Sequence, residues 1–195
     1  MRKLYFFDFD GTLTKTDTMF LFLKFYNSDK YFLNFAKHIP LFIMLKLKMA
    51  DAEKVKKSFI ASILKGESQE KISRKAKAFF DEYYPNIFRD NALDFIKNMK
   101  SENTESYIVT ASLDIWVQAF AEKFQMKLIA TEAKFEKGIY TGHFKTKNCN
   151  GQEKVNRIKK AIEGEKFDKT IAFGDTDGDR EMLAWANEGY FQFFH

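Results

Sequence analysis

The sequence has few of the residues that cross-link a chain or break its regular structure. Its 195 residues include one cysteine, two prolines and nine glycines. The single thiol, Cys149, excludes an internal disulfide, and the scarcity of proline and glycine argues against a disordered chain. Because the charged N-terminus does not read as a signal peptide, we expect a cytoplasmic protein in a reducing compartment.

Long uninterrupted apolar runs are also missing. The most apolar segment, residues 31–49, is interrupted by Lys37, His38, Pro40 and Lys46. It falls short of the roughly 18 consecutive apolar residues that indicate a membrane-spanning helix. We expect a buried helical hairpin here, and the alternative is an amphipathic stretch that contacts a membrane surface.

The positive charge is unevenly distributed along the chain. Residues 17–87 carry 13 basic and 8 acidic side chains, whereas the remainder carries 19 of each. No arginine cluster or compact basic stripe is present, which argues against a nucleic-acid partner. The excess fits a solvated, lysine-rich helical surface. Alternatively, it draws anions or an anionic membrane surface toward a nearby site.

The first 90 residues read as one strand followed by helices. Lys3–Phe7 is a short aromatic run that predicts a buried strand. Helical patterns fill residues 16–84. Within them, Asp51 and Ser68 are typical first residues of helices, and Pro85 ends the last one.

After Asp90 the pattern alternates between strands and helices. Strands are expected at 106–110, 127–131 and 170–173, with a hairpin around Gly138 and an edge strand at 190–191. Helices are expected at 90–99, 113–124, 151–162 and 179–186. This alternation predicts an α/β fold with a doubly wound, mostly parallel sheet. Residues 1–16 and 88–195 would form this unit, and residues 17–87 an inserted helical domain.

Two carboxylates follow the first strand directly. Asp8 and Asp10 lie two residues apart, so in an extended segment they point the same way. Gly11 permits a sharp bend or a close approach to a ligand. An ordinary Asp-Gly turn is the alternative, but no obvious partner strand follows it. Two acids at a strand end without nearby bases suggest a bound cation.

Three further segments of the chain supply candidate residues for the same site. Asp175 follows a later strand, and a third carboxylate there fits a Mg²⁺ pocket. Thr110 and Ala111 would offer a hydroxyl and free backbone N–H groups to phosphate oxygens. Lys154 lies just inside a predicted helix. Taken singly, a threonine here is more often a helix cap and a lysine a solvated surface residue.

Together these motifs resemble the haloacid dehalogenase superfamily of phosphohydrolases. The order is a strand with DxDGT, a strand with Thr, a helix Lys and a strand with GDxxxD. The matching residues are Asp8, Asp10, Thr110, Lys154, Asp175 and Asp179. The helical insertion after the first motif looks like the type-1 cap of the phosphoserine phosphatase-like branch. Residues 149–155 are similar to the third motif of that branch.

The resemblance implies a Mg²⁺-dependent phosphatase that acts on a small organic phosphomonoester. Asp8 would be the nucleophile that forms an aspartyl-phosphate, and Asp10 the general acid and base. Asp8, Asp175 and the Asp10 carbonyl would hold Mg²⁺, with Asp179 orienting its waters. Lys154 and the Thr110 hydroxyl would hold phosphate oxygens.

The substrate is left open by the sequence. Asp17 stands where phosphoserine phosphatases carry a glutamate that reads the substrate amine, and aspartate is shorter. Lys56 and Lys57 lie near the place of that enzyme's cap arginine, but lysine lacks its forked geometry. The aromatic, basic helical segment also looks like branch members that act on glycerolipid phosphates at a membrane surface. A phospho-accepting signalling module, resembling receiver domains, is the alternative from another functional class.

Overall fold

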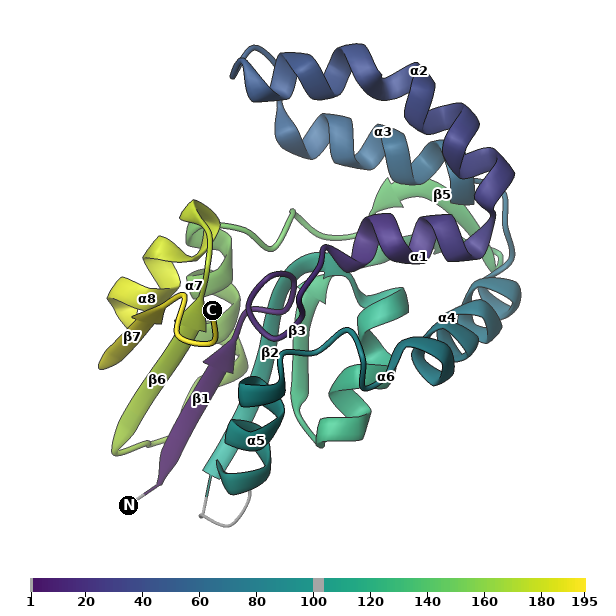
Figure 1. Ribbon diagram of the computed structural model, residues 1–195. Helices are drawn as coiled ribbons and strands as arrows, with labels where there is room; N and C mark the ends of the chain where they lie inside the picture. The colour runs from purple at the N-terminus through teal and green to yellow at the C-terminus, as the bar shows by residue number, and fades with distance from the viewer. Residues whose placement is uncertain (1, 100–103) are drawn as a thin grey trace.

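A five-stranded parallel sheet lies at the centre of one half of the molecule (Figure 1). The computed structural model describes residues 2–99 and 104–195. The strands pair in the order β3-β2-β1-β6-β7. Their bounds are β1 (Lys3–Phe7), β2 (Thr104–Leu113), β3 (Lys127–Thr131), β6 (Lys169–Gly174) and β7 (Glu188–Phe191). The predicted α/β class is confirmed, and β1 has the predicted bounds.

Helices cover both faces of this sheet. Tyr5 and Phe7 point into a core shared with α5 (Asp90–Met99) and α6 (Asp114–Phe124). Leu4 and Phe6 point into a second core with α7 (Gln152–Ala161) and α8 (Arg180–Trp185), which follows the short helix η1 (Asp177–Asp179). Alternate side chains of β1 thus serve opposite faces, as the period of two requires. The predicted doubly wound arrangement is confirmed.

Four helices follow β1 before the chain returns to the sheet. They are α1 (Thr18–Tyr26), α2 (Ser28–Lys46), α3 (Ala52–Leu64) and α4 (Gln69–Tyr83). Each begins after a side chain that accepts a hydrogen bond from a backbone N–H of the first turn. These residues are Asp17, Asn27, Asp51 and Ser68. The predicted helix starts at Asp51 and Ser68 are confirmed.

The chain enters and leaves this helical segment through two adjacent connections. The Lys15 N–H donates to the Ile87 carbonyl at 2.7 Å, and the Arg89 N–H donates to the Leu13 carbonyl at 2.9 Å. Beyond them, α1 contacts α6 through stacked rings of Phe22 and Trp116, whose centroids are 5.2 Å apart. One core therefore runs from the helical segment into the sheet unit. The unit boundaries at residues 16/17 and 87/88 stay a prediction.

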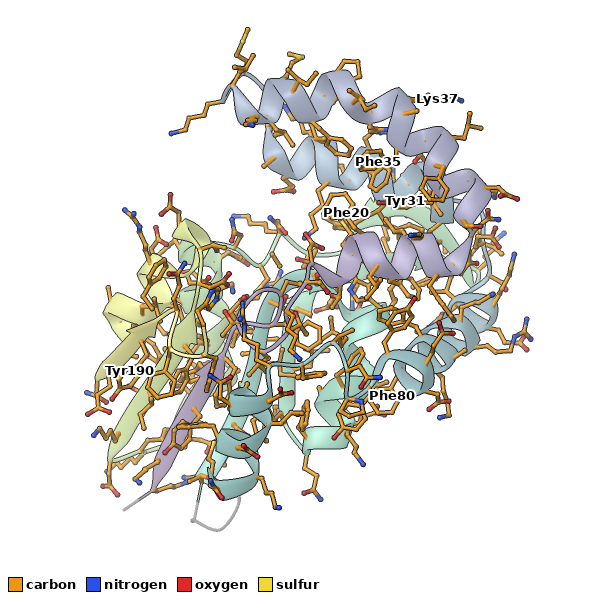
Figure 2. All side chains as sticks on the ribbon, in the orientation of Figure 1. Phe20, Tyr31, Phe35, Lys37, Phe80 and Tyr190 are labelled. Atoms are coloured by element: carbon orange, nitrogen blue, oxygen red, sulfur yellow. The ribbon has the colours of Figure 1, made fainter. Side chains whose placement is uncertain are left out.

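The expectation of a buried helical hairpin at residues 31–49 is wrong. The segment lies largely in the single helix α2, which continues through Pro40, and only His38 of this helix is fully buried. On the inner side of α2, Tyr31 and Phe35 pack on Phe59 of α3, and Phe35 also packs on Phe20 of α1 (Figure 2). Apolar side chains also occupy its outer side, where they are exposed. Within the described ranges, no helix combines the length and apolar character needed to cross a bilayer.

The predicted hairpin around Gly138 is present as β4 (Ala133–Glu136) and β5 (Ile139–Phe144). It lies against the helical segment. The Tyr140 N–H donates to the Glu67 carbonyl at 2.9 Å, and the Gly66 N–H donates to the Tyr140 carbonyl at 3.0 Å. Residues 133–144 were expected to belong to the sheet unit. These bonds hold them beside the connection between α3 and α4, where β4 and β5 form a two-stranded sheet apart from the five-stranded one.

Candidate active site

The carboxyl ends of β1, β2 and β6 open into a cleft of about 340 Å³. This is the edge of a parallel α/β sheet at which ligands bind. Among the predicted site residues, those that line the cleft are Asp8, Asp10, Asp17, Thr110, Ala111, Lys154 and Asp175. Asp179 is buried and hydrogen-bonded to Lys154. The structure therefore brings together all the residues that the sequence proposed for one site.

The centre of the site is a buried ion pair between Asp8 and Lys154. The Lys154 ammonium donates to Asp8 Oδ1 at 2.5 Å, to Asp179 Oδ1 at 2.6 Å and to the Val109 carbonyl at 2.8 Å. Burial alone would lower the pKa of Lys154, but the charges of Asp8 and Asp179 outweigh it and raise the pKa. The lysine is thus a fixed cation, held from three sides.

The pKa of Asp8 is subject to opposing influences. Burial raises its pKa to about 7, against the opposing effect of Lys154 and with a further rise from the Asp179 and Asp10 charges. Its other oxygen, Oδ2, accepts a bond from the Thr12 hydroxyl at 3.2 Å. Burial is thus the main reason that the pKa of Asp8 is raised, and the charge of Lys154 opposes this effect without cancelling it.

Asp179 supports the site through hydrogen bonds to Thr176 and Lys154. Its Oδ2 accepts bonds from the Thr176 N–H at 3.0 Å and hydroxyl at 2.9 Å, while its Oδ1 faces Lys154. A Cβ atom on Gly174 would come within 2.4 Å of the Asp179 Cβ, so this approach requires glycine. Asp179 therefore does two things: it orients Lys154, and it adds a carboxylate to the acidic group.

Three carboxylates are close enough to hold one metal ion. Asp8, Asp175 and Asp179 each offer an oxygen, and these oxygens lie within 4.8 Å of one another. The Thr12 hydroxyl joins two of them, because it also donates to Asp175 Oδ1 at 2.8 Å. Three carboxylates face one buried lysine, so a divalent cation would balance the charge. An all-oxygen donor set is the kind that Mg²⁺ prefers.

Asp10 is held by residues that the sequence analysis did not single out. Its Oδ1 accepts bonds from the Thr18 N–H at 2.7 Å and hydroxyl at 2.5 Å, and its Oδ2 accepts from the Ser112 hydroxyl at 2.5 Å. Thr18 belongs to α1 and Ser112 to β2. The Asp10 carboxylate is thus fixed between the helical segment and the sheet, and it lies outside the three-carboxylate group.

Thr110 and Ala111 lie at an irregularity in β2. The strand was expected to end at Thr110, but it runs to Leu113 with a shift of register between these residues. A bulge of this kind re-aims side chains beside a functional site. The Ser112 N–H donates to the Thr110 hydroxyl oxygen at 3.0 Å. Among the N–H groups of this turn, that of Ser112 is therefore not free, because it is bonded to Thr110.

The helical segment adds two charged residues to the cleft. Lys56 of α3 donates to the Ala111 carbonyl at 2.8 Å, and burial lowers its pKa despite the nearby charges of Asp10 and Asp17. The Asp17 carboxylate accepts from the Met19 N–H at 2.9 Å and so begins α1. Lys56 was not among the predicted site residues, because a helical pattern does not show which distant turn a lysine will face.

Comparisons with known proteins agree with this geometry. The model of the haloacid dehalogenase-like hydrolase family matches residues 5–184. Protein CicA of Caulobacter vibrioides is 32% identical over 190 residues, which cover 96% of this chain and 85% of CicA.

Solved structures share the fold. A Bordetella pertussis Tohama I protein of unknown function superposes with a TM-score of 0.84 at 19% identity, covering 98% of this chain and 89% of that one. A phosphoserine phosphatase, solved as a phospho-aspartyl intermediate analogue, gives a TM-score of 0.63 at 23% identity, covering 97% and 85%. The predicted likeness to the phosphoserine phosphatase-like branch is thereby confirmed for the fold. With the family match over most of its length, this chain belongs to the haloacid dehalogenase-like hydrolases.

Proposed function

We propose that the protein is a Mg²⁺-dependent phosphatase that hydrolyses small organic phosphomonoesters through an aspartyl-phosphate on Asp8. The observation that carries the proposal is the meeting of Asp8, Asp10, Thr110, Lys154 and Asp175 in one cleft. These residues come from β1, β2, β6 and α7 or directly follow those strands. Their side chains supply a nucleophile, an acid, oxyanion donors and a cation site.

The first step transfers the phosphoryl group to the protein. An Asp8 carboxylate oxygen attacks phosphorus, the bond from phosphorus to the alcohol oxygen breaks, and Asp10 gives its proton to the departing alkoxide. Thr18 and Ser112 fix the Asp10 carboxyl group in the cleft beside Asp8. This fixed position supports a role for Asp10 in protonating the oxygen that leaves opposite the nucleophile.

The second step releases phosphate. The Asp10 carboxylate takes a proton from water, whose oxygen attacks phosphorus as the bond to Asp8 breaks. Lys154 and the Thr110 hydroxyl hold oxygens of the phosphoryl group, where charge spreads in both transition states. Lys154 lies buried beside Asp8, and it would exchange one of its three hydrogen bonds for a bond to a phosphoryl oxygen.

Asp8 and Asp175 would hold Mg²⁺ with the Asp10 carbonyl, and Asp179 would support the site from below. When bound, the ion neutralises negative charge that otherwise repels a phosphate dianion. The surplus of carboxylates around Asp8 is the feature of this chain that supports the assignment.

Hydrolysis of a chromogenic aryl phosphate tests the proposal. We expect turnover with Mg²⁺ and a loss of at least about a hundredfold when a chelator removes it, since a bound metal stabilises such a transition state by several kcal/mol. A screen of phosphoserine, glycerol phosphates and related metabolites, compared by kcat/KM, then identifies the substrate class. Stable labelling of Asp8 without turnover would instead indicate the phospho-accepting signalling module.

Gly11→Ala should distinguish an effect on metal binding from a general loss of stability. Gly11 has a φ of +82°, and a Cβ there would lie 2.3 Å from Asp175 Oδ2. Gly138→Ala is the matched control, because Gly138 has a φ of +77° but no atom within 4 Å of a Cβ. Both variants should lose about 1 kcal/mol or more of unfolding free energy through backbone strain. Only Gly11→Ala should also lose the rise in melting temperature produced by Mg²⁺, and an equal response of both would contradict this placement of Asp175.

A second candidate substrate is a phosphomonoester carried by a membrane glycerolipid. The exposed apolar side chains of α2, together with the basic excess of residues 17–87, favour it. Lys56 and Asp17 face the cleft from the helical segment and would meet the part of the substrate beyond its phosphate. Including a lipid phosphate in the same screen, dispersed in detergent, compares the two candidates directly.

A further inference from the structure

The outer side of α2 carries an unusual concentration of exposed apolar residues. Seven of the eleven large apolar side chains that are exposed in the described chain lie between Phe32 and Met49. Phe32, Ile43 and Leu47 are 58%, 54% and 62% exposed. Single exposed apolar residues are normal on a soluble protein, but a contiguous group of them marks an interaction surface.

The spacing of these residues makes the group continuous. They recur every three or four positions, which places them along one side of a helix. The residues of this outer stripe are Phe32, Leu33, Ala36, Ile39, Pro40, Ile43, Met44 and Leu47. The inner side of α2 already packs, through Tyr31 and Phe35, on Phe59 of α3. The outer stripe is therefore not required for folding of the helical segment.

Lysines flank the stripe, and one exposed carboxylate, Asp29, lies at its N-terminal end in the first turn of α2. Residues 30–50 contain Lys30, Lys37, Lys46 and Lys48 and no acidic residue. In the described ranges, Lys37, Lys46 and Lys48 form no ion pair with a carboxylate. At 100° per residue, Lys30 and Lys37 fall along one edge of the stripe and Lys46 along the other. Figure 2 shows Lys37 extending outward from α2.

We infer that the outer stripe of α2 docks on the surface of an anionic lipid bilayer, with the helix lying in the plane of the interface. Such helices bury an apolar side in the boundary between headgroups and acyl chains while flanking lysines reach anionic headgroups. A protein partner fits less well, because lysine is depleted from protein interfaces. No helix in the described ranges is able to span a bilayer, so the contact is peripheral.

The α2–α3 pair gives this surface a defined orientation. Figure 1 shows α2 as the outermost layer of the helical segment, where it packs on α3 and, through Phe35 and Phe42, on Phe20 of α1. Lys56 of α3 contacts the cleft through the Ala111 carbonyl. Docking through α2 would therefore leave α3, which carries Lys56, on the side of α2 that faces away from the membrane. This inference does not depend on the proposed activity, since binding is measured without substrate.

Sedimentation of the full chain with lipid vesicles tests the inference. We expect binding to phosphatidylcholine vesicles that contain phosphatidylglycerol, weaker binding to phosphatidylcholine alone, and a decline as salt is raised. The variant Ile39→Ser/Ile43→Ser/Leu47→Ser should weaken binding at least about tenfold, since each large apolar side chain contributes to burial. Ile139→Ser, which removes an exposed apolar side chain from β5, should leave binding unchanged.

A charge pair of variants completes the test. Lys37→Glu/Lys46→Glu should abolish the preference for anionic vesicles, whereas Lys159→Glu/Lys160→Glu changes net charge equally on α7 and should preserve it. Absence of binding at low salt would overturn the inference, as would equal binding by all variants. A wild-type dimer that the serine variant dissociates, without vesicle binding, would assign the stripe to a second copy of this chain instead. Unchanged melting temperatures show that the variants fold.

Discussion

Asp8→Asn should abolish phosphomonoester hydrolysis, lowering kcat by at least about a thousandfold, the scale on which loss of an enzyme nucleophile acts. The amide keeps the size of the carboxylate but cannot attack phosphorus as an anion. The fold should persist, because Lys154 keeps its 2.6 Å bond to Asp179 when the Asp8 charge is lost. The measurement is steady-state turnover together with trapping of labelled phosphate on the protein, where the variant should carry no label.

Asp10→Asn is the matched comparison, since it removes one carboxylate from the same strand end. Here the nucleophile remains, but the proton donor to the alcohol and the acceptor from water are lost. We expect turnover to fall by about a hundredfold to ten-thousandfold, with labelled phosphate persisting on Asp8. Full activity in either variant would contradict the assignment. If Asp8→Asn kept the labelled phosphate and Asp10→Asn lost it, Asp10 would be the nucleophile and Asp8 the general acid and base.

The residues that the sequence predicted well are those whose place follows from a local rule. Strand β1 was predicted with its bounds because a short aromatic run before an Asp-Gly pair has few other readings. The ends of parallel strands meet at one edge, so Asp8, Thr110 and Asp175 had to converge once the sheet was inferred. The φ of +82° at Gly11 agrees with the sharp bend expected there, whereas its close neighbour, Asp175, was not foreseen.

Other features depend on contacts between distant segments, which a single sequence does not encode in a readable pattern. Thr18 and Ser112 fix Asp10, yet nothing in their spacing distinguishes them from ordinary polar residues. Lys56 reaches the cleft only because α3, which packs on α2 and β5, lies within reach of the Ala111 carbonyl. Residues 31–49 were expected to be buried because apolar composition usually means a core, but α2 has neighbours on one side only.

Lys154→Met should damage both the fold and the reaction. Methionine has a similar length but no charge, so Asp8 and Asp179 would face each other in a buried site without their shared cation. Breaking a buried ion pair in this way costs about 3–5 kcal/mol of unfolding free energy. Loss of the phosphate donor adds a fall of about a hundredfold to a thousandfold in kcat. Denaturant unfolding and turnover measure the two effects separately.

Lys56→Met is the control for this prediction, because Lys56 also lies at the cleft but its hydrogen bond is to the Ala111 carbonyl. It should cost less stability than Lys154→Met, since the carboxylates near Lys56, Asp10 and Asp17, are less buried than Asp8 and Asp179 and keep hydrogen bonds to other groups. Mg²⁺ should restore more stability to Lys154→Met than to the wild type, because that variant leaves one further negative charge for the divalent ion to offset. Equal losses in the two lysine variants, or no added response to Mg²⁺, would show that Lys154 is not the principal counter-ion of Asp8 and Asp179.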